Sequence, residues 1–215
     1  MSVESAYDQW SEQYDNNSNR TRDLEAVALR TTLKDLPFKR CLEIGCGTGK
    51  NTEWLITRAD HITAVDLSEG MLAKAGKKIA SDTVHFIQAD ILKPWTFRGG
   101  AYDLVIFSLV LEHIEQLGPM LKEAAMSLSP GGHVYIGELH PFKQYLGTKA
   151  RFETESGTKE VSCFVHHVSD FLNAAKSGGL ELAQFSEHFD EDPSAPPRIL
   201  SMLFRKTITW NRRPI

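Results

Sequence analysis

The stretch RCLEIGCGTGK, residues 40–50, decides how the rest of the chain is interpreted. A mainly apolar run to Ile44 ends in glycines at alternate positions, Gly45, Gly47 and Gly49, and an amphipathic segment follows at once. This order predicts a buried strand, a tight turn and the start of a helix. Because glycine adopts positive φ and has no Cβ, such a turn lets main-chain N–H groups approach a ligand at a helix N-terminus. We expect a nucleotide or nucleoside-like group there.

A second apolar run supports this interpretation. Ile62 to Val65 reads as another short strand, and it ends on Asp66. A carboxylate about twenty residues after such a glycine turn can accept both hydroxyls of an adenosine ribose. The turn alone could also be an ordinary strand-to-helix connection, and Asp66 is what favours an adenosine-bearing ligand.

Composition limits the class of protein. The chain has 215 residues, 41% hydrophobic and 24% charged, which is typical of a single soluble globular domain, so we expect one domain over residues 1–215. The net charge is −4 without a basic face, which argues against a nucleic-acid partner. The longest apolar run, Leu104 to Leu111, is too short for a membrane helix, so no membrane partner is expected.

The first residues and the cysteines point to the cytosol. MSVESAYDQW has no basic start followed by an apolar core, so it is not a secretory signal, and we expect a cytoplasmic protein. Cys41, Cys46 and Cys163 form neither a CxxC pair nor a metal-binding spacing. We interpret them as small buried residues and expect no metal site.

Strand and helix patterns alternate along the chain. They predict an α/β, Rossmann-like fold: five strand–helix units and a final strand pair, in a mostly parallel seven-stranded sheet with helices on both faces and an antiparallel terminal strand. The expected strands are residues 41–44, 62–65, 84–89, 102–107, 134–137, 180–186 and 199–206. The turn signal SPGG, residues 129–132, should separate a helix from the fifth strand, and Ser169 should cap a later helix.

Two segments do not fit this alternation. Residues 1–36 contain two helical patterns, the first with Tyr7, Trp10 and Tyr14 on one face and the second with a face from Leu24 through Val27, Ala28 and Thr31. The aromatic residues either pack against the domain or form a lid over the ligand. Residues 140–166 read as an inserted hairpin around Ser156-Gly157, which would be part of the substrate cover.

Five motifs together resemble the class I S-adenosylmethionine-dependent methyltransferases, most closely the small-molecule branch called type 11. They are LEIGCGTGK, AVDLSEGML, QADI, YDLVIFSLVLEHI and LSPGGHVYI, which span Cys41 to Ile136. The resemblance implies S-adenosylmethionine as cofactor and S-adenosylhomocysteine as product. Methyltransferases that act on DNA bases or glutamine amides resemble each other in an Asn/Asp-Pro-Pro-Tyr tetrapeptide, and this chain has FSLVLEH there. A small-molecule methyl acceptor is therefore expected, with the enzyme a monomer or homodimer.

The resemblance also implies a set of cofactor-binding residues. Asp66 would bind the ribose, Leu67 and Met71 would flank the adenine, and Asp90 with the Ile91 main chain would read its amino group. The remaining implied cofactor-binding residues are Tyr14, Glu43, Gly45, Cys46, Gly47, Ser108 and His113. Glu43, an acid inside a buried strand, could instead make a structural hydrogen bond, and Asp90 could be a cap.

A catalytic base is required only if the acceptor starts protonated. The histidines near the expected ligand-binding rim are His140, His166 and His167, of which His140 and His167 are the predicted catalytic residues. Each could equally be a substrate contact or a helix cap. Two other functions remain open: a nicotinamide-dependent oxidoreductase, which also uses a glycine turn and an acid, and a non-catalytic protein that binds S-adenosylmethionine.

Overall fold

The computed structural model describes residues 2–15, 17–154, 157–192 and 194–207, and its centre is a seven-stranded sheet of order β3-β2-β1-β4-β5-β9-β8. The strands are β1 (Arg40–Ile44), β2 (His61–Asp66), β3 (Val84–Gln88), β4 (Tyr102–Ser108), β5 (Leu128–Leu139), β8 (Leu180–His188) and β9 (Ile199–Lys206). A separate hairpin is formed by β6 (Arg151–Thr154) and β7 (Gly157–Glu160).

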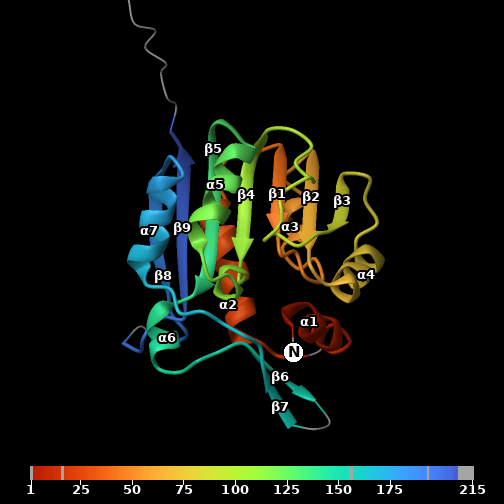
Figure 1. Cartoon of the computed structure of the whole chain (residues 1–215), viewed down its shortest axis with the longest axis vertical. Helices are drawn as coiled ribbons and strands as arrows, with labels where there is room; N and C mark the ends of the chain where they lie inside the picture. The colour runs from red at the N-terminus through yellow and green to blue at the C-terminus, as the bar shows by residue number, and fades with distance from the viewer. Residues whose placement is uncertain (1, 16, 155–156, 193, 208–215) are drawn as a thin grey trace, which may run out of the picture.

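The sheet has the predicted mostly parallel arrangement. Strands β1 to β5 are parallel, whereas β9 lies between β5 and β8 and is antiparallel to both. The chain leaves β1 for β2 on one side and later returns to β4 on the other, so strand order reverses between β1 and β4. In sheets of this kind, ligands bind beyond the carboxyl ends of the strands at this switch point. Figure 1 shows these strand ends at the lower edge of the sheet.

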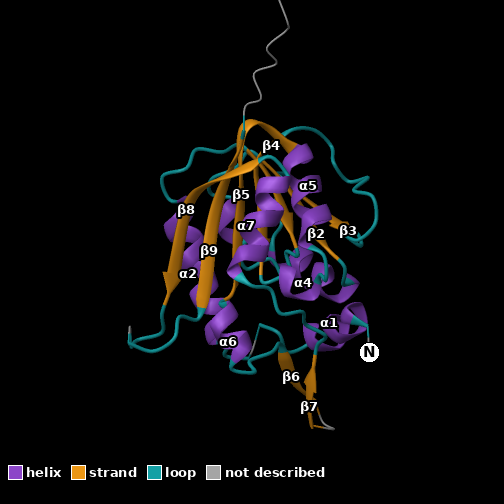
Figure 2. Cartoon of the chain, turned by 60° about the vertical axis from the view of Figure 1, so that its left-hand side comes forward, coloured by secondary structure: helices purple, strands orange, loops and turns teal. Residues whose placement is uncertain are grey.

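Helices cover both faces of the sheet, and period-two alternation assigns the side chains of each strand to opposite layers. The helical elements are α1 (Val3–Ser11), α2 (Arg20–Leu33), α3 (Thr52–Leu55), α4 (Glu69–Lys78), the 3₁₀ turn η1 (Leu111–His113), α5 (Leu117–Ser127), α6 (Pro141–Tyr145) and α7 (Val168–Ser177). Leu42 and Ile44 pack in the core beneath α5 and α7, whereas Cys41 packs in the opposite core with α2 and α3. Figure 2 shows α7 and α2 on opposite sides of the sheet.

Parts of the two segments outside the alternation lie beyond the carboxyl edge of the sheet, whereas α2 packs on one face of the sheet. Helix α1 and the β6–β7 hairpin are close together there in both views (Figures 1 and 2). A small core of Ala6, Trp10, Met71 and Val161 joins α1 to α4 and to the residue that follows the hairpin. Helix α1 and the hairpin therefore cover the edge at which the sequence places the ligand.

The structure corrects several local expectations. No helix separates β3 from β4, because the described residues 89–101 are irregular, so the five strand–helix units are incomplete. The SPGG turn lies inside β5, where the pairing with β4 jumps from Leu128 to His133. His167, and not Ser169, caps α7. On α2 the buried face runs through Glu25, Leu29 and Leu33, whereas Val27 is exposed.

Candidate active site

A cavity of about 510 Å³ opens at the carboxyl edge of the sheet, between the strand ends and the covering segments. This volume is within the range of small-molecule sites. Its wall includes all the predicted cofactor-binding residues: Tyr14, Glu43, Gly45, Cys46, Gly47, Asp66, Leu67, Met71, Asp90, Ile91, Ser108 and His113. The sequence order of parallel strands brings them together, because residues after successive strands meet at one edge.

The glycine turn is shaped by its backbone. Gly45 has φ +71° and Gly47 has φ +54°, backbone angles that residues with a Cβ rarely adopt. A Cβ on Gly45 would lie 2.1 Å from Cγ2 of Val110, whereas a Cβ on Gly47 would meet no protein atom within 4 Å. The N–H groups of Gly45 and Cys46 donate to the carbonyl oxygen of Val65, at 2.7 and 3.0 Å. The expectation that these amides are free for a ligand is thus wrong, and the glycines chiefly supply space.

Asp66 and Asp90 lie on the wall formed by the ends of β2 and β3. The Asp66 carboxylate accepts from the N–H groups of Gly47 and Ser68, at 2.8 and 2.9 Å, and burial raises its pKa. Asp90 accepts from the N–H of Leu92 at 2.9 Å. Main-chain N–H groups therefore hold both carboxylates in place, and both carboxylates line the same cavity. Binding of a ribose by Asp66 and of an adenine amino group by Asp90 would require this arrangement.

Two further carboxyl groups are buried, one near the end of β1 and one within α2. Glu43 accepts from Oγ1 of Thr52 at 2.6 Å, and burial raises the pKa of Glu43 to about 8. Glu25 accepts from Tyr135 and Asn51, each at 3.2 Å, and burial raises its pKa to about 7. Oδ1 of Asn51 is buried without a hydrogen-bond partner among the described residues. This end of the cavity offers an unused acceptor beside two acids, which suits a ligand that carries positive charge or N–H donors.

Sequence reasoning missed Glu25 and Asn51. The spacing of Glu25 could have revealed it. Glu25 precedes Ala28 by three residues and Leu29 by four, which places it on the buried, mainly apolar face of α2. It was overlooked because the phase of the helix was assigned to Leu24 and Val27 instead. Gly137 also matters here, because a Cβ at that position would lie 2.4 Å from Oε1 of Glu25.

The aromatic residues of the N-terminal segment both pack and line the cavity. The rings of Tyr7 and Trp10 lie 5.6 Å apart, and those of Trp10 and Tyr14 lie 4.9 Å apart. Arg22 donates to the carbonyl oxygen of Tyr14, and its guanidinium lies 5.1 Å from the Tyr14 ring. The carboxylate of Asp15 accepts from Oγ1 of Thr48 at 2.6 Å and so ties this segment to the glycine turn.

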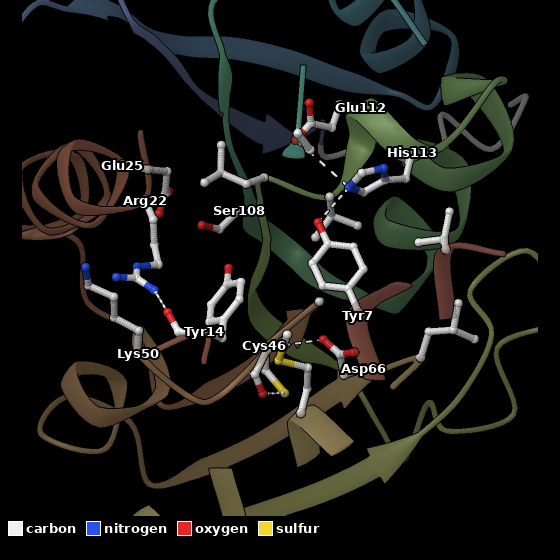
Figure 3. A pocket seen from close by; sticks show the side chains of 18 of the residues that line it. Tyr7, Tyr14, Arg22, Glu25, Cys46, Lys50, Asp66, Ser108, Glu112 and His113 are labelled. Carbon is white, nitrogen blue, oxygen red and sulfur yellow. Dashed lines mark hydrogen bonds and ion pairs between the residues drawn. The ribbon is translucent and has the colours of Figure 1, made fainter. Parts of the chain in front are cut away.

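A second polar group lies at the opposite end of the cavity, around His113 (Figure 3). The hydroxyl of Tyr7 and Nε2 of His113 are 2.8 Å apart, and Nδ1 of His113 is 2.9 Å from the carbonyl oxygen of Ser162. Glu112 is buried beside them, and burial raises its pKa. Three separate parts of the chain therefore meet at this imidazole.

The predicted catalytic histidines lie elsewhere. His140 caps α6 through the N–H of Phe142, and its Nε2 is 2.9 Å from Oε1 of Glu187. His167 caps α7 and is 2.8 Å from the hydroxyl of Tyr145. Neither is among the residues that line the cavity. Both histidines are helix caps, which was the alternative interpretation of their role. The geometry therefore gives no support to a catalytic role.

The fold and this cavity define a class of protein: Rossmann-like α/β proteins that bind an adenosine-bearing ligand at the strand-order switch point. Residues 42–136 match the family model described as "Methyltransferase domain". Ubiquinone biosynthesis O-methyltransferase of Coxiella burnetii is 28% identical over 166 residues, which are 74% of this chain and 69% of that protein. Malonyl-[acyl-carrier protein] O-methyltransferase of Enterobacter lignolyticus is 33% identical over 114 residues, 53% of this chain and 44% of that protein.

Solved structures share the fold. A putative S-adenosylmethionine-dependent methyltransferase from Listeria monocytogenes has a TM-score of 0.74 at 22% identity, covering 86% of this chain and 99% of that one. N-methyltransferase NodS from Bradyrhizobium japonicum, in complex with S-adenosylhomocysteine, has a TM-score of 0.70 at 19% identity, covering 96% and 99%. Residues 42–136 therefore have the sequence of a methyltransferase domain of the type 11 kind, and the chain has the fold of class I S-adenosylmethionine-dependent methyltransferases. The family match favours methyl transfer over the nicotinamide alternative. None of the helices in the described ranges is long and apolar enough to cross a membrane.

Proposed function

We propose that the chain moves the methyl group of S-adenosylmethionine to a small-molecule acceptor that binds in the same cavity, between the strand ends and the Tyr7–His113 pair. The observation that carries this proposal is the continuity of the cavity: one wall holds the residues expected for the donor, and the other is built from α1, η1 and the segment before β6. Donor and acceptor would therefore meet inside a covered space rather than at an open surface.

The adenosine half of the donor fits the wall at β2 and β3. Asp66 would accept from the ribose hydroxyls, and Asp90 with the Ile91 main chain would read the adenine amino group. Leu67 and Met71 supply apolar walls for the ring. A charged acid that accepts two main-chain N–H groups is already oriented, which lowers the entropic cost of binding.

The methionine half fits the opposite wall. Its ammonium would donate to the unpartnered Oδ1 of Asn51, near the acids Glu43 and Glu25. The guanidinium of Arg22, on the same wall, would suit its carboxylate. Gly45, Cys46, Gly47 and Ser108 would lie along this half of the ligand, and Tyr14 would close over it.

The bound donor supplies an activated methyl group on a positively charged sulfur. The protein would contribute alignment of the acceptor and exclusion of water, since methyl transfer disperses charge and needs in-line geometry. The covering elements are tied down for this purpose: Asp8 on α1 accepts from Oγ of Ser68 at 2.5 Å and from the N–H of Gly70 at 3.2 Å. Helix α1 would thus act as a lid over the donor.

The acceptor is proposed to be a small molecule, in line with the small-molecule O-methyltransferases among the relatives. Lys149, with its amine 3.0 Å from Glu160, lines the acceptor side of the cavity. A cytoplasmic location and a monomeric or homodimeric state stay predictions from the sequence.

Thermal unfolding tests the donor site. S-adenosylhomocysteine at about 100 times its Kd is expected to raise the Tm by about 5 °C or more, and reduced nicotinamide nucleotides should leave it unchanged. Incubation with methyl-labelled donor and a metabolite extract should then label a small molecule. No shift with S-adenosylhomocysteine would contradict the proposal, and a shift without any labelled product would favour a non-catalytic binding protein.

A further inference from the structure

We propose that His113 is the general base of the methyl transfer, and that the acceptor is a phenol whose hydroxyl takes the place now held by the hydroxyl of Tyr7. This inference rests on the proposed function and adds to it a catalytic residue and a class of substrate.

The hydrogen bonds of His113 fix its tautomer. Nδ1 lies 2.9 Å from the carbonyl oxygen of Ser162, and a carbonyl oxygen can only accept. Nδ1 therefore carries the ring proton of the neutral imidazole, and Nε2 presents a lone pair. The partner of Nε2 is the hydroxyl of Tyr7 at 2.8 Å, which must donate. The imidazole is thus held with its basic nitrogen toward an O–H group on the cavity wall.

The turn that carries His113 is rigidly supported. Leu109 adopts φ +55°, which is unfavourable for a residue with a Cβ. The carboxyl group of Glu138 offsets this by accepting from the N–H groups of Val110 and Leu111, at 3.0 and 2.8 Å. The carbonyl oxygen of Glu112 in the same turn accepts from the N–H of Phe164 at 2.7 Å. A base must be held in place to act, and this turn is held from β5 and from the segment after β7.

Glu112, Cys163 and Tyr7 surround the imidazole of His113. Oε1 of Glu112 lies 4.0 Å from Nε2, and Oε2 of Glu112 is buried without a hydrogen-bond partner among the described residues. Sγ of Cys163 lies 3.9 Å from Nδ1, and burial raises the pKa of this thiol to about 12, so it stays neutral. Burial also raises the pKa of Tyr7 well above its ordinary value. Glu112 is therefore the neighbour that can carry negative charge and stabilise an imidazolium.

The present partner of Nε2 indicates the class of acceptor. Tyr7 places a phenol hydroxyl on Nε2 while its ring stacks on Trp10 at 5.6 Å. A carboxylate acceptor would already be ionised and would need no base. A phenol is protonated near neutral pH and is the same group that the site holds now. The aromatic side chains beside the imidazole then offer a face on which a second aromatic ring can pack.

The step balances in atoms and charge. The phenol O–H bond breaks and its proton goes to Nε2 of His113, while an electron pair of the oxygen forms the bond to the donor's methyl carbon. The bond between that carbon and sulfur breaks, and its electron pair stays on sulfur, which becomes a neutral thioether. The imidazolium later releases its proton to water.

Ionisation of a bound phenol tests this without turnover. The probe is 4-nitrophenol, whose ionised form absorbs at longer wavelength, added to the complex with S-adenosylhomocysteine and titrated with acid. In the wild type the bound probe should ionise at a pH about one unit or more below that in His113→Gln, because only the wild type accepts the proton. His85→Gln, at an exposed position on β3, should behave as the wild type.

Tyr7→Phe provides an independent variant if His113→Gln folds poorly. It removes the hydroxyl that competes for Nε2 and keeps the ring, so 4-nitrophenol should bind on the order of fivefold more tightly. The inference is overturned if the probe does not bind, if it ionises equally in His113→Gln, or if Tyr7→Phe weakens its binding. Preferential binding of benzylamine over 4-nitrophenol would also overturn it, in favour of an amine acceptor. A normal Tm shift with S-adenosylhomocysteine in these cases would leave the proposed function intact.

Discussion

The two walls of the cavity are built in different ways. Most of the donor wall comes from consecutive strand ends, so its glycines and the acids Glu43, Asp66 and Asp90 lie within residues 42–136, which match the methyltransferase family model. Helix α2 adds Glu25 and Arg22. The acceptor wall joins α1, η1 and the segments on either side of the β6–β7 hairpin, which are far apart in the sequence. Parallel strand order creates most of the donor wall, whereas the acceptor wall depends on contacts between segments far apart in the chain. Single substitutions on the donor wall should therefore have large effects, whereas the acceptor wall should adjust to substitutions by small shifts of its segments.

The largest effect is expected at Asp66 on the donor wall. Asp66→Asn removes the charge that would accept from the ribose and replaces one oxygen with a donor, so S-adenosylhomocysteine should bind about 100-fold more weakly or worse. Isothermal titration calorimetry measures this. Asp60→Asn, at an exposed acid paired with Lys39, is the matched control and should bind as the wild type does. A loss of tenfold or less would show that Asp66 serves the glycine turn and not the ligand.

The glycine turn is expected to give the next largest effect. Gly45→Ala forces a Cβ against Val110 at a positive φ, so the free energy of unfolding should fall by about 2 kcal/mol or more. Gly76→Ala on α4 is the control: a Cβ there meets nothing within 4 Å, and it should stabilise by about 0.5–1 kcal/mol. Urea denaturation measures both. Equal stability of Gly45→Ala and the wild type would mean that the turn can move away from η1 and that the donor wall is less rigid than we infer.

The buried acids predict a dependence of stability on pH. The folded pKa values of Glu25, Glu43 and Glu138 are raised by burial, to about 7, about 8 and about 8, from an ordinary value of 4.5. The folded state then keeps protons that the unfolded chain releases, so the free energy of unfolding should fall as pH rises from about 4.5 to about 8 and level off on either side.

Glu43→Gln separates one acid from the others. This variant cannot titrate at that position, so its loss of stability between pH 5 and pH 8 should be smaller than that of the wild type by about 1 kcal/mol or more. Urea denaturation across this range measures the difference. Glu53→Gln, at an exposed acid on α3, should lose as much as the wild type. Parallel curves for Glu43→Gln and the wild type would show that Glu43 is ionised in the folded protein.

The smallest effect is expected on the covering side. Asp8→Asn weakens the hydrogen bonds that hold α1 to Ser68 and Gly70, so the lid should open more often. S-adenosylhomocysteine should dissociate about threefold faster, with little change in Tm, since these are partly exposed contacts. Stopped-flow fluorescence of Trp10 reports the motion, and Glu4→Gln at the exposed start of α1 is the control. A dissociation rate equal to that of the wild type would indicate that α1 does not gate the donor.

Local sequence patterns predict a structural feature well when that feature depends on a single helix or strand. Ser68 stands directly before Glu69 and caps α4, because a cap depends only on the next few residues. The buried face of α2 was predicted one residue away from its true position. An acid such as Glu25 is not expected on a buried face, and the groups that stabilise it there, Tyr135 and Asn51, lie far away in the sequence. His140 and His167 were predicted as catalytic because they lie near the expected ligand-binding rim, yet each caps a helix.

The sequence alone determined the class of fold and the seven-stranded sheet, and it named glycines and strand-end acids that line the cavity, but not Glu25 or Asn51. It could do so because strand order and the carboxyl ends of parallel strands follow from hydrophobic periodicity and glycine positions. The sequence named His113 as a cofactor-binding residue, and the tertiary structure decided which groups its imidazole meets. His113 meets Tyr7 and Ser162, 106 and 49 residues away in the chain, and no local pattern encodes a contact made by packing separate segments over the sheet.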